Sequence, residues 1–176
     1  ALRGFDVYIT STVPPGGGLS SSAALEIALL RALRTAFALP LGDEDLARLG
    51  QAAEHEVVGA RVGIMDQMVC SLGRPGAAMF LDTRSLAHRL LPLPPELELL
   101  VIHSGVHHRL AQAAGGRDYN TRRTECEEAA RLLGVAMLRD AEALPTAELE
   151  AKLAALPVSL GRRARHVVSE DARVLQ

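Results

Sequence analysis

The chain has 176 residues, of which 48% are hydrophobic, and its formal net charge is −2. This length suits one globular domain or part of a larger two-domain protein, and the near balance of charge gives no reason to expect nucleic acid or an acidic membrane as a partner. No apolar run reaches the roughly 18 residues of a membrane span, and the first residues lack the pattern of a signal peptide. Cys70 and Cys126 are too few for a disulfide framework, so we expect reduced thiols and a soluble cytoplasmic protein.

The first predicted elements are a strand and a loop rich in glycine and serine. Phe5, Val7 and Ile9 alternate with polar or outward positions, which indicates a strand. The loop follows at residues 14–24, PPGGGLSSSAA, where three glycines free the backbone to turn tightly and bring bare amides to an anion. Neither GxxxxGK[ST] nor GxGxxG matches it. A flexible linker is the alternative, but the flanking strand and helix favour a loop between packed elements.

A long helix leaves this loop, with Ser20 as its expected N-cap. Apolar residues then recur at helical spacing, at Leu25, Ile27, Leu29, Leu30 and Leu33. The first-turn N–H groups of a helix lack intrahelical partners and carry partial positive charge, which favours a phosphate at that end. The hydroxyls of Ser20, Ser21 and Ser22 would add ligands for phosphate oxygens or for a divalent cation.

Two further helices are predicted to carry acidic residues of interest. Asp43 is expected to cap the first of them, which ends at Gly59 and has a buried face formed by Leu46, Leu49, Ala53, Val57 and Val58. Glu54 lies on it. A glutamate with a serine hydroxyl such as Ser22 suits Mg²⁺, although a solvated glutamate on a helix face is the commoner case.

The second of these helices begins near Gly63 and buries Ile64, Met68 and Leu72. Asp66 lies on it between apolar neighbours, where packing gives no reason for a carboxylate. It could stabilise the helix N-terminus. Alternatively, it could act as a base toward a substrate hydroxyl, a role worth about 10²–10⁴ in rate.

Three strand candidates come next, at residues 77–82, 87–91 and 97–103. The last holds a continuous apolar run, as expected for a strand covered on both faces. Strands that follow helices in this way predict an α+β fold. His103, His107 and His108 lack the spacing and the carboxylate that would favour a zinc site.

After a loop at residues 106–116, a charged helix is predicted from Tyr119, with Cys126, Ala129, Ala130 and Leu133 on its apolar side. An amphipathic stretch lies between Pro145 and Pro157, and a last helix is expected from Gly161.

Taken together, these motifs resemble the family of galactose, homoserine, mevalonate and phosphomevalonate (GHMP) kinases. The loop PPGGGLSSSAA is similar to the phosphate loop of that family. The galactokinase branch is indicated by four further motifs, GIMDQ at 63–67, FLDTRSL at 80–86, VIHSGVHH at 101–108 and YNTRRTECEEA from Tyr119. The resemblance implies an S5-like N-terminal part at residues 1–95 and part of a ferredoxin-like domain at residues 96–176.

The resemblance also implies a set of roles. ATP phosphates would bind at Gly16, Gly17, Gly18, Leu19, Ser20, Ser21 and Ser22, and Mg²⁺ would bind Ser22 and Glu54. Asp66 would face the C1 hydroxyl of galactose as a base or an electrostatic partner, and the sugar would also contact the Gly63 backbone and the Tyr119 hydroxyl. The reaction would be transfer of the γ-phosphoryl of ATP to galactose.

Some family features have no match here. The upstream arginine and sugar-binding residues and a second glycine-rich motif are absent from these 176 residues, so we expect a truncated chain that phosphorylates galactose poorly or not at all by itself. A regulator that binds sugar and nucleotide without catalysis is the main alternative. A kinase for another sugar, such as N-acetylgalactosamine, is a further one, and mevalonate or homoserine as the acceptor fits the motifs less well.

Overall fold

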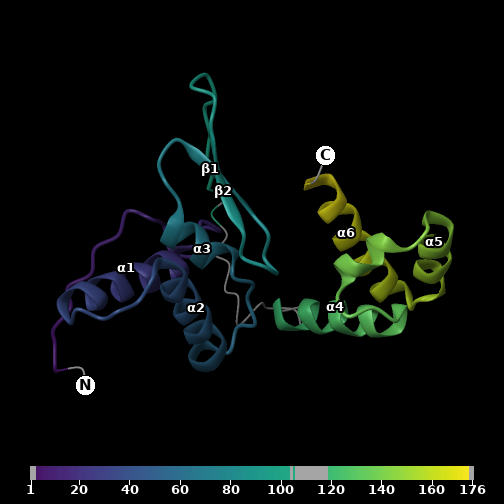
Figure 1. The fold of residues 1–176 in the computed structure, drawn as a ribbon, viewed down its shortest axis with the longest axis horizontal. Helices are drawn as coiled ribbons and strands as arrows, with labels where there is room; N and C mark the ends of the chain where they lie inside the picture. Colours follow the sequence, from purple (N-terminus) through teal and green to yellow (C-terminus); the bar gives the residue numbers. More distant parts are fainter. Residues whose placement is uncertain (1–2, 104, 106–118, 175–176) are drawn as a thin grey trace. The chain divides into compact units, whose positions relative to one another are not determined.

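A computed structural model describes residues 3–103, 105 and 119–174. The chain divides into two compact units, residues 1–110 and 111–176, and each is described by itself (Figure 1). The first unit contains helices and a small sheet, and the described part of the second consists of helices.

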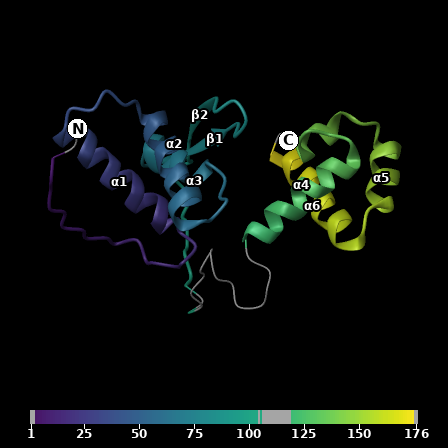
Figure 2. The same cartoon turned by 90° about the horizontal axis from the view of Figure 1, so that it is seen from below.

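Three helices form the body of the first unit. They are α1 (Ser21–Ala36), α2 (Asp43–Ala53) and α3 (Met65–Leu72), and each contacts the other two. Figure 2 shows them side by side. Among the most buried apolar side chains of these helices are Ile27, Leu46, Ala47 and Met68, all between 0 and 2% exposed. The spacing of Ile64, Met68 and Leu72 therefore predicted the buried side of α3 correctly, since all three pack in one cluster.

The start of α2 differs from the expectation at Asp43. Gly42 is the N-cap, and its backbone N–H donates to Asp45 Oδ2 at 2.7 Å. Asp43 is instead the first helical residue and forms an ion pair with Arg34 at 2.8 Å. The acidic side chain three residues after the cap can reach back to the cap amide, which leaves Asp43 available for the arginine on α1.

The end of the same helix also differs from a regular α-helix. A π-helical turn, η1 (Glu54–Val58), continues α2 and ends at Gly59, whose φ is 78°. Val57 and Val58 were expected on the buried face but are 84% and 53% exposed. A π turn adds a residue to the repeat and so rotates the following side chains away from the face that an α-helical period predicts.

The two predicted strands at 77–82 and 87–91 are confirmed to within a residue. They are β1 (Ala77–Leu81) and β2 (His88–Pro92), an antiparallel pair in which Ala77 lies opposite Pro92 and Leu81 opposite His88. The turn between them is held by Asp82, whose Oδ1 accepts from Arg84 N at 2.9 Å and Ser85 N at 3.3 Å.

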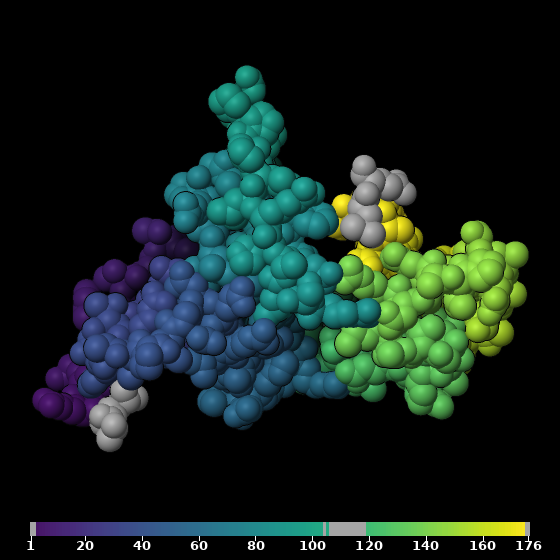
Figure 3. All heavy atoms as spheres, viewed as in Figure 1, coloured from purple at the N-terminus to yellow at the C-terminus, as the bar shows by residue number. Residues whose placement is uncertain are grey.

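The predicted strands at 5–9 and 97–103 are not found. Within the described residues neither segment joins a ladder, and Leu99 and Leu100 are 76% and 84% exposed. The N-terminal segment, purple in Figure 3, lies at the surface. Strand structure depends on a partner for the backbone, and an apolar pattern in one segment cannot supply that partner.

In the described part of the second unit, four helical segments pack around one core. They are α4 (Tyr119–Leu133), the 3₁₀ helix η2 (Leu138–Ala143), α5 (Thr146–Ala155) and α6 (Val158–Val174). The core holds Ala129, Ala130, Leu133, Leu138, Ala141, Leu153, Ala164 and Val168. The predicted apolar side of the helix from Tyr119 is thus confirmed, whereas the last helix begins at Val158, three residues before the expected Gly161.

Candidate functional site

The glycine-rich loop has a backbone that needs glycine at two positions. Gly16 and Gly18 have φ of 68° and 75°, a region that side chains with a Cβ rarely adopt. Gly17 N donates to Pro14 O at 3.4 Å, which closes a turn between them. Where the sign of φ alternates along successive residues, as it does around Gly16 and Gly18, their N–H groups form a concave surface suited to an anion.

Ser20 occupies the N-cap position of α1, as expected, but its side chain forms no capping hydrogen bond. Its φ and ψ are 55° and 39°, whereas side-chain capping typically requires an extended backbone. The first turn of α1 contains no acidic residue. The positive end of a 16-residue helix is therefore not neutralised by its own side chains, which favours an anion at the loop.

The structure brings together Ser22 and Glu54, which lie 32 positions apart in the chain. Ser22 Oγ hydrogen-bonds to Glu54 Oε1 and lies 3.3 Å from Glu26 Oε1. Glu54 is only 3% exposed, although it belongs to a helix end whose next residues face solvent. The π turn thus places this carboxylate inward, toward the first turn of α1.

The chemistry of these groups fits Mg²⁺. Glu54 forms no ion pair within the described part of the chain, and a buried carboxylate normally has a cationic partner. Carboxylate and hydroxyl oxygens are hard donors, and Mg²⁺ uses few protein ligands while keeping several waters. Among residues 3–103, 105 and 119–174, no group of three or more His, Cys, Asp or Glu side chains is arranged to hold a metal. His107 and His108 lie outside the described residues.

Glu26 adds a second carboxylate to this cluster. Burial raises the pKa of Glu26, and the nearby Glu54 raises it further, while a hydrogen bond from Gln67 opposes the shift. The two glutamates therefore repel one another in the absence of a cation. A divalent ion beside them would relieve that repulsion.

Asp66 is the second residue of α3 and is half-buried. The N-cap of α3 is Ile64, and no side-chain capping bond is formed there, so Asp66 is not a cap. The next residue, Gln67, donates from Nε2 to Glu26 Oε2 at 3.3 Å. Burial raises the pKa of the Cys70 thiol, and the carboxylates of Asp66 and Glu26 raise it further. The two carboxylates therefore lie close enough to the same thiol to act on it electrostatically.

The two other predicted sugar contacts lie in different units. Gly63 precedes α3, and a Cβ built there meets no atom within 4 Å, so its backbone borders open space. Tyr119 is the first residue of α4 and is 37% exposed. Its unit is described separately, so its part in a common site with Asp66 stays a prediction.

Sequence reasoning missed three residues of this region. Glu26 lies four positions after Ser22, and that helical spacing was the signal that could have placed it on the same face. Gln67 carries no such signal. The side chain of His103 lies beside the loop, since a Cβ at Gly17 would be 3.4 Å from its Cδ2.

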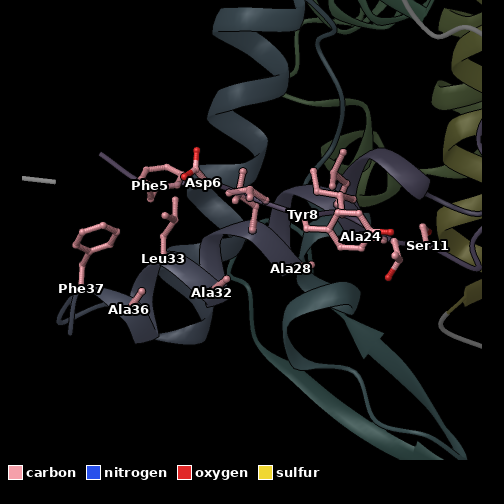
Figure 4. Close-up of a pocket in the computed structure, with 15 residues that line it drawn as sticks. Phe5, Asp6, Tyr8, Ser11, Ala24, Ala28, Ala32, Leu33, Ala36 and Phe37 are labelled. Carbon is pink, nitrogen blue, oxygen red and sulfur yellow. The ribbon is translucent and has the colours of Figure 1, made fainter. Parts of the chain in front are cut away.

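An apolar hollow in the first unit lies elsewhere. It has a volume of about 520 Å³ and lies between the N-terminal segment and the side of α1 that carries Ala24, Ala28, Ala32 and Ala36 (Figure 4). Phe5 closes one end by an edge-to-face contact with Phe37, with ring centroids 5.9 Å apart. Its lining is mainly apolar and includes none of the predicted site residues, so the charged cluster is the better candidate for phosphate chemistry.

Comparison with known proteins agrees with this geometry. Residues 1–74 match the family model described as the GHMP kinases N terminal domain. This part of the chain is similar to a GHMP kinase N-terminal domain. The matched span contains the loop, Ser22, Glu54 and Asp66.

A solved structure extends the likeness beyond that span. The crystal structure of Lactococcus lactis galactokinase complexed with galactose is 26% identical and superposes with a TM-score of 0.73 over 92% of this chain. The α+β class and the galactokinase-like fold are thereby confirmed. The chain spans 42% of the length of that galactokinase. No described helix is long and apolar enough to cross a membrane.

Proposed function

We propose that this chain provides the phosphate and metal site of a galactokinase, an enzyme that transfers the γ-phosphoryl group of ATP to the C1 hydroxyl of galactose. The observation that carries the proposal is the contact between Ser22 and the buried Glu54 beside a loop of left-handed glycines. The similarity to a galactokinase that binds galactose supports the choice of sugar.

In this proposal the amides of residues 16–22 hold the nucleotide phosphates at the N-terminus of α1. Ser22 and Glu54 hold Mg²⁺, which when bound neutralises charge on the phosphates. Much of the catalysis would come from positioning, because phosphoryl transfer asks little covalent chemistry of the protein.

Asp66 is assigned to the acceptor. The C1 hydroxyl oxygen forms a bond to the γ-phosphorus, its proton passes to the Asp66 carboxylate, and the bond from phosphorus to the bridging oxygen breaks to release ADP. The Gly63 backbone and the Tyr119 hydroxyl orient the sugar. Residues 1–95 would form the part with the loop and the base, and residues 96–176 would form part of a second domain.

The test is nucleotide binding by the purified chain, measured by calorimetry with ADP and Mg²⁺. Replacing Glu54 by Gln removes one charged contact, worth about 1.5–3 kcal/mol, so affinity for ADP in the presence of Mg²⁺ should fall roughly 10- to 100-fold. The matched control is Glu56→Gln, on the same turn but exposed, and it should bind as the wild type does.

A measurement of turnover distinguishes a catalytic kinase from a regulator that binds sugar and nucleotide without catalysis. For these 176 residues alone we expect binding without efficient release of ADP, because they span 42% of the related galactokinase. If Glu54→Gln binds ADP and Mg²⁺ as tightly as the wild type, the metal assignment is wrong. Binding of both ligands by a longer chain with no turnover would favour the regulator.

A further inference from the structure

Glu26 and Gln67 form a polar bridge between two helices of the site. Glu26 lies on α1 one turn after Ser22, and its two carboxylate oxygens have different partners. Oε1 lies 3.3 Å from Ser22 Oγ, and Oε2 accepts from Gln67 Nε2 on α3 at 3.3 Å. The bridge thus runs from the predicted metal ligand Ser22 to the residue next to Asp66.

The third helix fixes the bridge in place. Gly50 of α2 lies directly against it, because a Cβ built on Gly50 would be 3.2 Å from Glu26 Oε2 and 3.1 Å from Gln67 Cγ. Gln67 is only 2% exposed. Neither side chain has free space on the α2 side, so a displacement of one is transmitted to the other.

The choice of an amide at position 67 is informative. Gln67 Oε1 is buried and has no hydrogen-bond partner in the described structure, which costs about 1–3 kcal/mol. An apolar side chain would avoid that cost. The amide supplies a donor to Glu26 without adding charge to a cluster that already holds two carboxylates.

From these contacts we propose that Glu26 and Gln67 are positioning residues. They orient the Ser22 hydroxyl toward Glu54 and hold α3, and with it Asp66, in a fixed place relative to the metal ligands. The contact between the two helices rests on the Glu26–Gln67 hydrogen bond. Its effect on metal binding rests on the proposed function. Outer partners of metal ligands commonly change metal affinity by 10- to 100-fold.

The test uses Mn²⁺ as the probe, with its binding in the presence of ADP followed by electron paramagnetic resonance. Glu26→Gln leaves one acceptor oxygen where the bridge uses two, so the side chain loses its contact with either Ser22 or Gln67, and we expect about tenfold weaker Mn²⁺ binding. Gln67→Glu breaks the bridge with a third carboxylate. The double variant reverses the polarity of the bridge and keeps the net charge, so it should restore affinity to within about threefold. Glu44→Gln, exposed on α2, is the control.

The restoration decides the question, since general loss of packing would not be reversed by a second substitution. A double variant that binds Mn²⁺ no better than Glu26→Gln would overturn the proposal. If the wild type does not bind Mn²⁺ with ADP, the proposed function fails instead. The urea midpoints of the wild type, the two single variants and the double variant then test the bridge itself. If the shift of the double variant equals the sum of the shifts of the two single variants, the bridge is refuted.

Discussion

At the level of single residues, the tightest glycine contact in a helix interior lies at Gly161 in α6. A Cβ built there would be 2.8 Å from the backbone oxygen of Leu153 on α5. Backbone oxygen cannot move as the end of a flexible side chain can. The glycine is therefore required by the close approach of the two helices.

We predict that Gly161→Ala destabilises the chain by about 1–3 kcal/mol, as overpacked substitutions do. In an unconstrained helix the same change would stabilise by about 1 kcal/mol, so the sign alone distinguishes the two cases. Urea unfolding followed by circular dichroism measures it. Ser159→Ala, exposed in the same helix, should change stability by less than about 0.5 kcal/mol, and an increase in stability for Gly161→Ala would contradict the contact.

Residue types also explain how much of the site could be foreseen. The sequence predicted the site residues that are chemically distinctive, namely the glycines and serines of residues 14–22 and the carboxylates of Glu54 and Asp66. Glu26 and Gln67 look like ordinary helix residues. Their importance comes from the neighbours they meet across helices, and those neighbours are 41 positions apart.

At the level of elements, η2 and α6 share a pair of carboxylates. Burial raises the pKa of Glu142 on η2, and the Asp171 carboxylate on α6 raises it further, while Arg139 opposes the shift. Arg139 Nε lies 3.6 Å from Asp171 Oδ2. Like charges at this contact disfavour the ionised form of Glu142 in the folded state.

The direction of the shift fixes the pH dependence. The folded state holds the Glu142 proton more tightly than the unfolded chain, so this group adds stability as pH falls from above its raised pKa toward about 4.5. We predict that Glu142→Gln raises the urea midpoint of the second unit at pH 7 and flattens its change between pH 7 and 5. Glu148→Gln, on the surface of α5, should do neither. A Glu142→Gln variant with an unchanged midpoint at pH 7 would refute the repulsion.

Element boundaries were predictable where the signal is local. Gly59 ends the helix that contains Glu54, and the spacing of Ile64 and Met68 marked the buried side of α3. The π turn was not predictable, because its extra residue is fixed by what Glu54 reaches and not by helix propensity. The absence of a strand at residues 97–103 was not predictable either. Their apolar run predicted a strand, but a strand requires a partner segment that the local pattern does not reveal.

At the level of the whole molecule, the described residues form two separate cores. One is built around Ala47, Ile64 and Met68, and the other around Ala129, Leu133 and Ala164. Each has its own set of buried residues within its compact unit. Domains with separate cores commonly unfold as separate cooperative units.

We therefore predict two unfolding transitions, resolved by hydrogen exchange at increasing urea. Leu133→Ala removes a side chain that is 3% exposed and should cost about 2–5 kcal/mol in amides of residues 119–174 alone. Leu46→Ala, at 0% exposed, should act in the same way on residues 3–103 alone. One common transition, shifted equally by both variants, would show a single cooperative unit.

The sequence by itself determined the identity of the chemical groups and the places where local backbone rules apply. It specified a loop that can take left-handed angles, helices with periodic apolar faces, and carboxylates suited to a cation, since each depends on residues within a turn or two. Only the tertiary structure decided that Ser22 meets Glu54, that Glu26 and Gln67 join their helices, and that residues 97–103 form no strand. Those outcomes depend on which distant segments pack together, because hydrogen bonds and burial are satisfied between elements as well as within them.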